Sequence, residues 1–250
     1  MHFIEPDWPA PANVFALSTT RQGGSSRPPF ESFNLAHHVA DDAASVVANR
    51  ELLALALPAE ARLQWLNQVH GVNVVQAGQG DSCPEADGSW SKQVGTACAV
   101  MTADCLPVLF CSRSGDRVAA AHAGWRGLLS GVLEATVEAL AAPPGELLAW
   151  MGPAIGPGAF EVGAEVRDAF LSAQGVDQQA IEHCFQPSAG RAGHYLADLY
   201  ALARIRLNAA GITAVYGGDY CTFSDSQQFF SYRRDGQTGR MASLVMLRPA

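Results

Sequence analysis

Three side chains in the sequence have the donor chemistry of a metal site: His70, Cys105 and His122. Each lies where polar residues interrupt apolar, strand-like segments, in NQVHG, MTADCLPVLF and AAAHAGWRG. Two imidazoles and one thiolate suit zinc, and a zinc site with three protein ligands keeps a fourth position for water or substrate. The sequence therefore predicts a zinc site with these three residues as the catalytic group. Copper is the alternative metal.

A predicted β-hairpin is the reason for grouping Cys105 with His122. Strands at 106–111 and 117–122 flank a polar loop at 112–115. In the register that this loop implies, the two residues face each other with Cβ atoms ~4.5–5.5 Å apart. A shift of one residue would place them on opposite faces of the sheet, so the grouping depends on the register.

Other interpretations of these residues stay open at this stage. Cys105 and His122 also fit a metal-free hydrolase or amidase, with the thiol as nucleophile and the imidazole as base. A third alternative is a metal-binding protein without catalytic activity. His70 alone is typical of a loop histidine, and His122 alone of a residue that caps a strand. The motifs HExxH, GxSxG, GxGxxG and GxxxxGK[ST] are missing from the sequence.

Composition limits the class of protein. The chain has 250 residues, 48% of them hydrophobic, and a formal net charge of −8, so it can bury a full core and is not disordered. Lys92 is the only lysine, which argues against binding nucleic acid through phosphate contacts. No apolar run approaches the ~20 residues of a membrane span, and MHFIEPDWPA is not a signal peptide. We expect a cytoplasmic protein, and a monomer is feasible at this size.

The elements that must position these residues alternate in type along the chain. We expect strands at residues 14–19, 63–67, 72–77, 97–101, 106–111, 117–122, 147–151, 213–216, 229–232 and 242–247. We expect helices at 128–142, 162–173 and 197–210, and one that begins after Asp41 or Asp42 and ends before Pro58. Residues 81–92 read as irregular. This mixture predicts an α/β or α+β fold with mixed sheets in one domain.

The ordered motifs resemble the YfiH-type family, which was named polyphenol oxidase or laccase-like and is associated with purine nucleoside phosphorolysis. Besides the three segments above, the resemblance includes STTRQGG, FNLAHHVADD, GPAIGPGAFEVGAEV and FFSYRRDGQTGRMAS, and so covers essentially the full chain. It implies a single domain over residues 1–250 with a layered α-β-β-α sandwich. It also implies a metal site at the same three residues.

The resemblance further implies an activity and its substrates. The family's reactions are phosphorolysis of adenosine, inosine and methylthioadenosine, and deamination of adenosine, with a link to peptidoglycan editing. Purine nucleosides and phosphate are then the expected partners. Copper oxidase chemistry ranks below zinc chemistry, because seven histidines without a His-x-His pair do not supply the clustered histidines of a multicopper oxidase.

The family motifs also suggest which residues contact the substrate. The candidates for phosphate or ribose binding are Arg21, Asn34, His38 and Arg233. Arginine suits phosphate because its planar fork forms two parallel hydrogen bonds; the alternative for each arginine is a structural ion pair. Asp104 is a candidate for orienting a metal ligand or for acid–base catalysis, although its side chain is expected on the strand face opposite Cys105. Phe230 and Tyr232 either stack on a purine or belong to the core.

Overall fold

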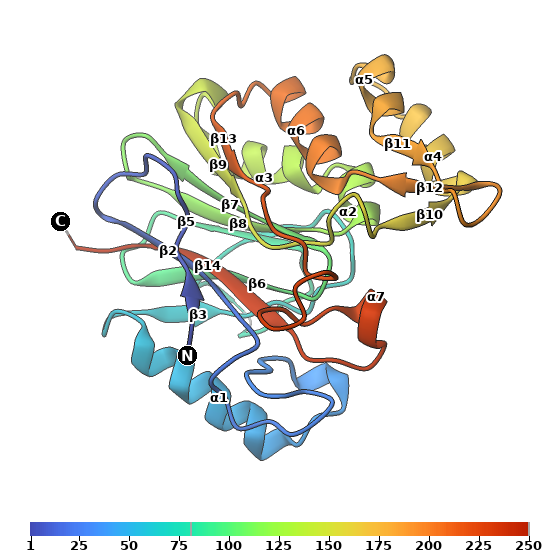
Figure 1. The fold of residues 1–250 in the computed structure, drawn as a ribbon. Coiled ribbons are helices and arrows are strands. Elements are labelled where there is room, and N and C mark those ends of the chain that lie inside the picture. The colour runs from blue at the N-terminus through green and yellow to red at the C-terminus, as the bar shows by residue number, and fades with distance from the viewer. Residues whose placement is uncertain (81, 250) are drawn as a thin grey trace.

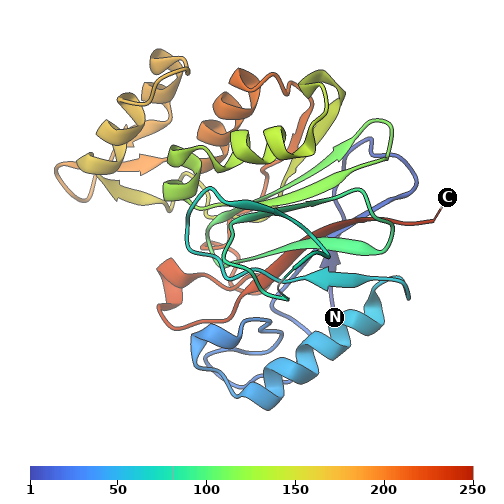
Figure 2. The same cartoon turned by 180° about the vertical axis from the view of Figure 1, so that it is seen from behind.

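Two β-sheets packed face to face form the centre of the computed structural model, which describes residues 1–80 and 82–249 (Figure 1). A long helix, α1 (Ala43–Ala56), covers the outer face of one sheet, and a group of helices covers the outer face of the other (Figure 2). This arrangement confirms the predicted mixed α/β fold with α-β-β-α layers.

The first sheet has five strands and lies under α1. In spatial order these are β1 (Phe3–Ile4), β2 (Val14–Thr19), β14 (Met241–Leu247), β6 (Thr96–Thr102) and β3 (Arg62–Gln64). Helix α1 begins where the Asp42 side chain accepts a hydrogen bond from the Ser45 N–H at 2.9 Å, a normal N-cap. Its Leu53 packs into the cluster that joins this sheet to the helix.

The second sheet has six strands and carries the predicted hairpin. In spatial order these are β13 (Val215–Gly217), β9 (Leu147–Met151), β7 (Leu106–Ser112), β8 (Val118–Ala123), β5 (Gly88–Ser91) and β4 (Val74–Gln76). Side chains along β7 alternate between the two neighbouring layers: Val108 and Phe110 pack under the helices, and Leu109 packs against the first sheet. Residues 106–111 of the strand are therefore apolar because both faces of the strand are covered.

The remaining elements lie outside the two central sheets. A small third sheet contains β10 (Glu161–Gly163), β12 (His194–Ala197) and β11 (Phe185–Pro187). The helices are α2 (Trp125–Ser130), α3 (Val132–Leu140), α4 (Ala164–Leu171), α5 (Gln178–His183), α6 (Leu199–Ala209) and α7 (Tyr232–Asp235), with 3-10 turns η1 (His37–Val39) and η2 (Pro144–Glu146). Within residues 1–80 and 82–249, no helix has both the length and the apolarity to cross a membrane.

The hairpin forms, but its predicted register is wrong by two residues. Pro107 rather than Cys105 pairs with His122, because the turn occupies residues 113–116, with Ser112 N–H bonded to Arg117 O. An even shift leaves every side chain on its expected face. Cys105 and His122 therefore still lie on the same face of the sheet.

Three other local predictions are also wrong. Residues 81–92 were expected to be irregular, yet β5 pairs there with β8; residue 81 itself lies outside the described residues. Residues 229–232 form no strand, since Ser231 caps α7 by accepting a hydrogen bond from the Arg234 N–H. The helix expected at 128–142 is two helices, α2 and α3, separated at Gly131, whose φ of +102° is left-handed.

Two leucines of α1 provide a matched test of the packing between this helix and the first sheet. Leu53 is fully buried, whereas Leu55 is 83% exposed. We expect Leu53→Ala to lower the free energy of unfolding by about 2–5 kcal/mol, because it leaves a cavity. Leu55→Ala should change it by less than about 0.5 kcal/mol. Urea unfolding measures both, and equal losses would contradict the described packing.

Candidate functional site

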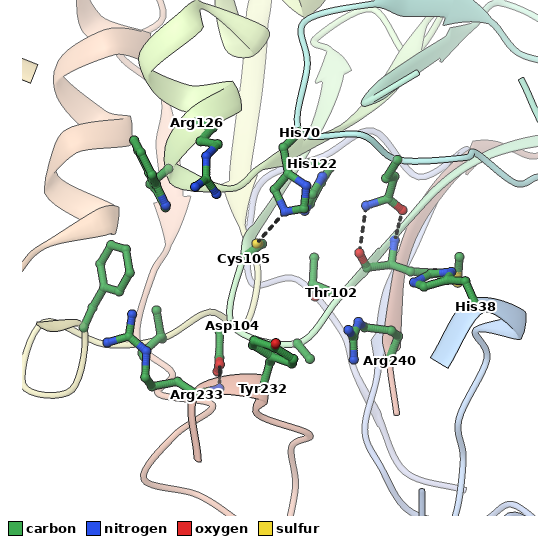
Figure 3. Close-up of a pocket in the computed structure, with 16 residues that line it drawn as sticks. His38, His70, Thr102, Asp104, Cys105, His122, Arg126, Tyr232, Arg233 and Arg240 are labelled. Carbon is green, nitrogen blue, oxygen red and sulfur yellow. Dashed lines mark hydrogen bonds between the residues drawn. The ribbon is translucent and has the colours of Figure 1, made fainter. Parts of the chain in front are cut away.

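The structure brings the three predicted metal donors together. His70 follows β3, Cys105 precedes β7, and His122 lies near the end of β8. Their donor atoms all lie within 4.8 Å of one another, with His70 Nε2 at 3.7 Å from Cys105 Sγ (Figure 3). The two imidazole rings meet edge to face with centroids 4.8 Å apart. A set of this size and composition fits a single zinc or copper ion.

A buried carboxylate, which the sequence analysis missed, fixes two of these donors. Asp87 is fully buried and lies 2.8 Å from His122 Nδ1. Its carboxylate also accepts hydrogen bonds from the backbone N–H groups of Val69, His70 and Gly71, at 3.2, 2.9 and 2.6 Å. One side chain therefore holds both the His122 ring and the loop that carries His70.

The contact with Asp87 determines which His122 nitrogen can bind a metal. Because Nδ1 is paired with the carboxylate, Nε2 is the nitrogen left for Cys105 or a metal ion. Carboxylates that orient histidine ligands in this way are common in metal sites. Burial alone would raise the pKa of Asp87, but the hydrogen bonds from His122 and the backbone outweigh it and lower this pKa. The carboxylate is therefore charged at neutral pH.

Cys105 and His122 favour each other's charged forms in the metal-free protein. Burial opposes the Cys105 thiolate, but the positive charge of His122 and hydrogen bonds from both histidines outweigh burial and lower the pKa of Cys105 to about 6. Burial likewise opposes the His122 imidazolium, yet the Cys105 thiolate and Asp87 raise the pKa of His122. A cysteine binds a metal ion as its thiolate, and the Cys105 side chain is a thiolate at neutral pH.

Close packing explains why a glycine, Gly124, follows β8, the strand that carries His122. A Cβ atom on Gly124 would lie 2.9 Å from Cys105 Sγ and 2.9 Å from His70 Cδ2. Any larger residue would therefore displace two of the three donors. The AHAGWRG segment therefore supplies one donor, His122, and at Gly124 leaves the space that Cys105 and His70 occupy.

The three donors lie in a cavity of about 500 Å³. Figure 3 shows the side chains that surround it. Its lining also includes His38, Gln68, Met101, Thr102, Ala103, Asp104, Trp125, Arg126, Ile155, Phe160, Tyr232, Arg233 and Arg240. Of the four predicted substrate contacts, His38 and Arg233 are in this lining, and Arg21 and Asn34 are not.

Arg21 and Asn34 make structural contacts instead. The Arg21 guanidinium donates to the backbone carbonyls of Glu31 and Ser226. The fully buried Asn34 side chain accepts hydrogen bonds from the N–H groups of Ala36 and Arg240. Asn34 therefore joins the segment before η1 to the segment before β14, and both segments carry residues of the cavity wall.

The structure separates the remaining candidates. Asp104 accepts hydrogen bonds from the Thr222 hydroxyl at 2.6 Å and from the Arg233 N–H at 2.7 Å, so it holds Arg233 in place. Phe230 is fully buried in the core. Tyr232 lines the cavity and is 61% exposed, which leaves its ring accessible to a ligand.

The role of Asp87 can be tested through metal affinity. Asp87→Asn loses the negative charge that holds His122 and the loop around His70, so we expect zinc affinity to fall about 10- to 100-fold. Competition with a chromophoric chelator measures this affinity. Asp225→Asn is a matched control, because within residues 1–80 and 82–249 the Asp225 carboxylate accepts hydrogen bonds from Gln228 alone, three residues along the chain. Wild-type zinc retention in Asp87→Asn would refute the role.

The state of Cys105 can be tested by alkylation of the chelator-treated protein. Its thiolate forms as pH rises through its pKa, so the labelling rate should rise with an inflection near pH 6. His122→Gln should move this inflection upward, because it removes the neighbouring positive charge. Cys98 should stay unlabelled, since burial raises its pKa to about 12. Peptide-resolved mass spectrometry separates the cysteines, and an inflection for Cys105 at the ordinary value of ~8.5 would contradict the pairing.

Comparison with known proteins places the chain in a family. A family model described as multi-copper polyphenol oxidoreductase laccase matches residues 15–248. A purine nucleoside phosphorylase of Pseudomonas aeruginosa is 59% identical and the purine nucleoside phosphorylase YfiH of Escherichia coli 52% identical, each over 98% of both proteins. The crystal structure of protein NMB0706 of Neisseria meningitidis covers 100% of both chains, with a TM-score of 0.92 and 49% identity. The chain therefore belongs to the laccase-like family that includes the YfiH-type proteins.

Proposed function

We propose that this protein is a metal-dependent purine nucleoside phosphorylase in which His70, Cys105 and His122 hold a zinc ion. The observation that carries the proposal is the compact His–Cys–His donor set inside a cavity of about 500 Å³. The cavity volume fits a small organic substrate. The relatives named purine nucleoside phosphorylase, which match nearly the whole chain, support the substrate class.

The cavity wall has side chains suited to each part of such a substrate. Phosphorolysis joins a phosphate oxygen to the ribose C1′ atom and breaks the bond from C1′ to the base, whose nitrogen takes the electron pair. The rings of Trp125, Phe160 and Tyr232 offer apolar surfaces on which a purine can pack. Arg233 and His38 offer donors for phosphate or for the ribose hydroxyls.

The protein groups also set the conditions for catalysis at the donor set. When bound, a zinc ion supplies Lewis-acid chemistry next to the substrate. Asp87 keeps His122 oriented, and Asp104 keeps Arg233 at the cavity wall. Adenosine, inosine and methylthioadenosine are the proposed substrates, with deamination of adenosine as a second reaction. The cytoplasmic location, the monomeric state and the single domain over residues 1–250 stay predictions.

One observation favours a second candidate function, a metal-free cysteine hydrolase. Asp87, His122 and Cys105 form a chain of carboxylate, imidazole and thiol, which is the arrangement of a catalytic triad. Cys105 would be the nucleophile and His122 the base. The two functions differ in whether activity survives removal of the metal.

Products formed from adenosine test the proposed function. Protein of measured zinc and copper content is incubated with adenosine, with and without phosphate, and the products are separated by chromatography. We expect adenine and ribose 1-phosphate only when phosphate is present, and inosine with ammonia from deamination. No turnover of adenosine, inosine or methylthioadenosine by fully loaded protein would refute the nucleoside assignment.

A cysteine variant connects the activity to the metal. We expect Cys105→Ser to lower both zinc content and phosphorolysis, the latter by about 100-fold or more, since it removes a ligand itself. Cys221→Ser is the matched control, because Cys221 lies in a different surface hollow. Activity that survives complete chelation would instead support the cysteine hydrolase.

A further inference from the structure

The cavity around the donor set is rich in arginine, although the protein as a whole is acidic. Arg126, Arg233 and Arg240 line it, and none of them forms an ion pair with a carboxylate anywhere in residues 1–80 and 82–249. The one carboxylate in the lining, Asp104, already accepts hydrogen bonds from Thr222 and the Arg233 backbone. Three guanidinium groups thus face one carboxylate in this lining, although the chain carries a net charge of −8.

Arg240 is the most enclosed of the three arginines. It is half-buried, whereas Arg126 and Arg233 are exposed. Its Nη1 donates to the backbone carbonyls of Thr238 and Gly239 at 2.9 and 3.0 Å. In the described part of the chain its Nε and Nη2 groups have no hydrogen-bond acceptor, which leaves them for a ligand. Within the described residues no carboxylate forms an ion pair with this half-buried guanidinium, and the charges of Cys105 and Asp104 act on it from a longer range. Its burial carries a desolvation cost that a bound anion would offset.

The backbone around Arg240 is fixed by buried contacts. Asn34 Oδ1 accepts a hydrogen bond from the Arg240 N–H at 2.9 Å, and the Leu35 N–H donates to Arg240 O at 3.2 Å. Asn34 Oδ1 also binds the N–H of Ala36, just before the 3-10 turn that carries His38. Arg240 and His38 are therefore held on the same wall, on the opposite side of Cys105 from Arg126 and Arg233 in Figure 3.

We propose that Arg240, with His38 beside it, forms a subsite for an oxyanion of the phosphate class next to the metal donors. The inference deepens the proposed function, on which it rests, because phosphate is the second substrate of that reaction. The planar guanidinium has two free donor groups for phosphate oxygens, and charge-assisted hydrogen bonds of this kind are strong. The anion is either free phosphate or the phosphate group of a nucleotide.

Kinetics of Arg240→Gln test the subsite. We expect its KM for phosphate to rise about 10- to 100-fold, the range for losing charged hydrogen bonds, with little change in zinc content or in KM for adenosine. Arg240→Lys keeps the charge but loses the fork, so it should lie between wild type and Arg240→Gln. Arg27→Gln is the matched control, because Arg27 is exposed, lies outside the cavity lining and loses the same charge.

Direct binding separates this inference from the proposed function. Inorganic phosphate and adenosine 5′-monophosphate are each titrated into wild-type and variant protein by calorimetry. Arg240-dependent binding of phosphate alone supports free phosphate as the occupant, and a loss confined to the nucleotide supports its phosphate group. If such binding occurs but no nucleoside is cleaved, the proposed function fails and the oxyanion subsite stands.

Chemical modification of the wild-type protein tests the subsite even if Arg240→Gln does not fold. Phosphate should protect Arg240 from modification by phenylglyoxal, read by peptide mass spectrometry. The proposal is overturned if phosphate and the nucleotide both leave Arg240 unprotected. It is equally overturned if folded, zinc-loaded Arg240→Gln binds both with wild-type affinity.

Discussion

The site depends on the burial of a single carboxylate between two chain segments. The Asp87 carboxylate accepts hydrogen bonds from three backbone N–H groups of the loop at residues 67–71. It also pairs with His122 Nδ1. A buried charge is costly unless it is fully hydrogen-bonded, and here the required partners are the segments that carry two metal donors. The hydrogen bonds that satisfy the buried charge of Asp87 are therefore the same ones that position His70 and His122.

The layered fold explains why the cavity forms where it does. Cys105 and His122 lie at the ends of β7 and β8 in one sheet, whereas Thr102 and Arg240 lie at the ends of β6 and β14 in the other. Phe160 comes from the segment before β10, in the third sheet, and His38 from η1. The ends of strands from two packed sheets therefore meet around one cavity. Three arginines line this cavity, although the chain has a net charge of −8.

The alternating strand and helix segments predicted a mixed α/β fold, and the family resemblance predicted its α-β-β-α layers. His70, Cys105 and His122 were grouped from their sequence contexts, and the structure places their donor atoms within 4.8 Å of one another. Strand β2 formed as predicted, and α1 began at Asp42, one of the two predicted caps, and ended before Pro58. The placement of Cys105 and His122 on one face tolerated a register error of two residues. An error of one residue would have separated them. Cys105 and His122 therefore lie on the same face of the second sheet, although the predicted register of the hairpin was wrong.

Residues whose roles depend on distant contacts could not be predicted. Asp87 lies next to β5, in a segment that reads as irregular because its glycine and serines are buried only by contacts with distant segments, among them β4, β6 and β8. Asn34 was expected at the substrate, yet it lies outside the cavity lining and binds the backbone of Arg240. No local pattern distinguishes Arg240 from a surface arginine. Phe230 and Tyr232 look alike in sequence, but they lie on either side of Ser231, the N-cap of α7. Phe230 packs in the core, and Tyr232 lies at the cavity.

The central claim is that one cysteine and two histidines bind a single metal ion inside the cavity. X-ray absorption at the zinc edge of the zinc-loaded protein tests it most directly, because sulfur and nitrogen scatter at different distances, ~2.3 and ~2.0–2.1 Å. We predict one sulfur and two imidazole nitrogens in the coordination shell, with the sulfur lost in Cys105→Ser. A shell of nitrogen and oxygen only in the wild-type protein would contradict the account.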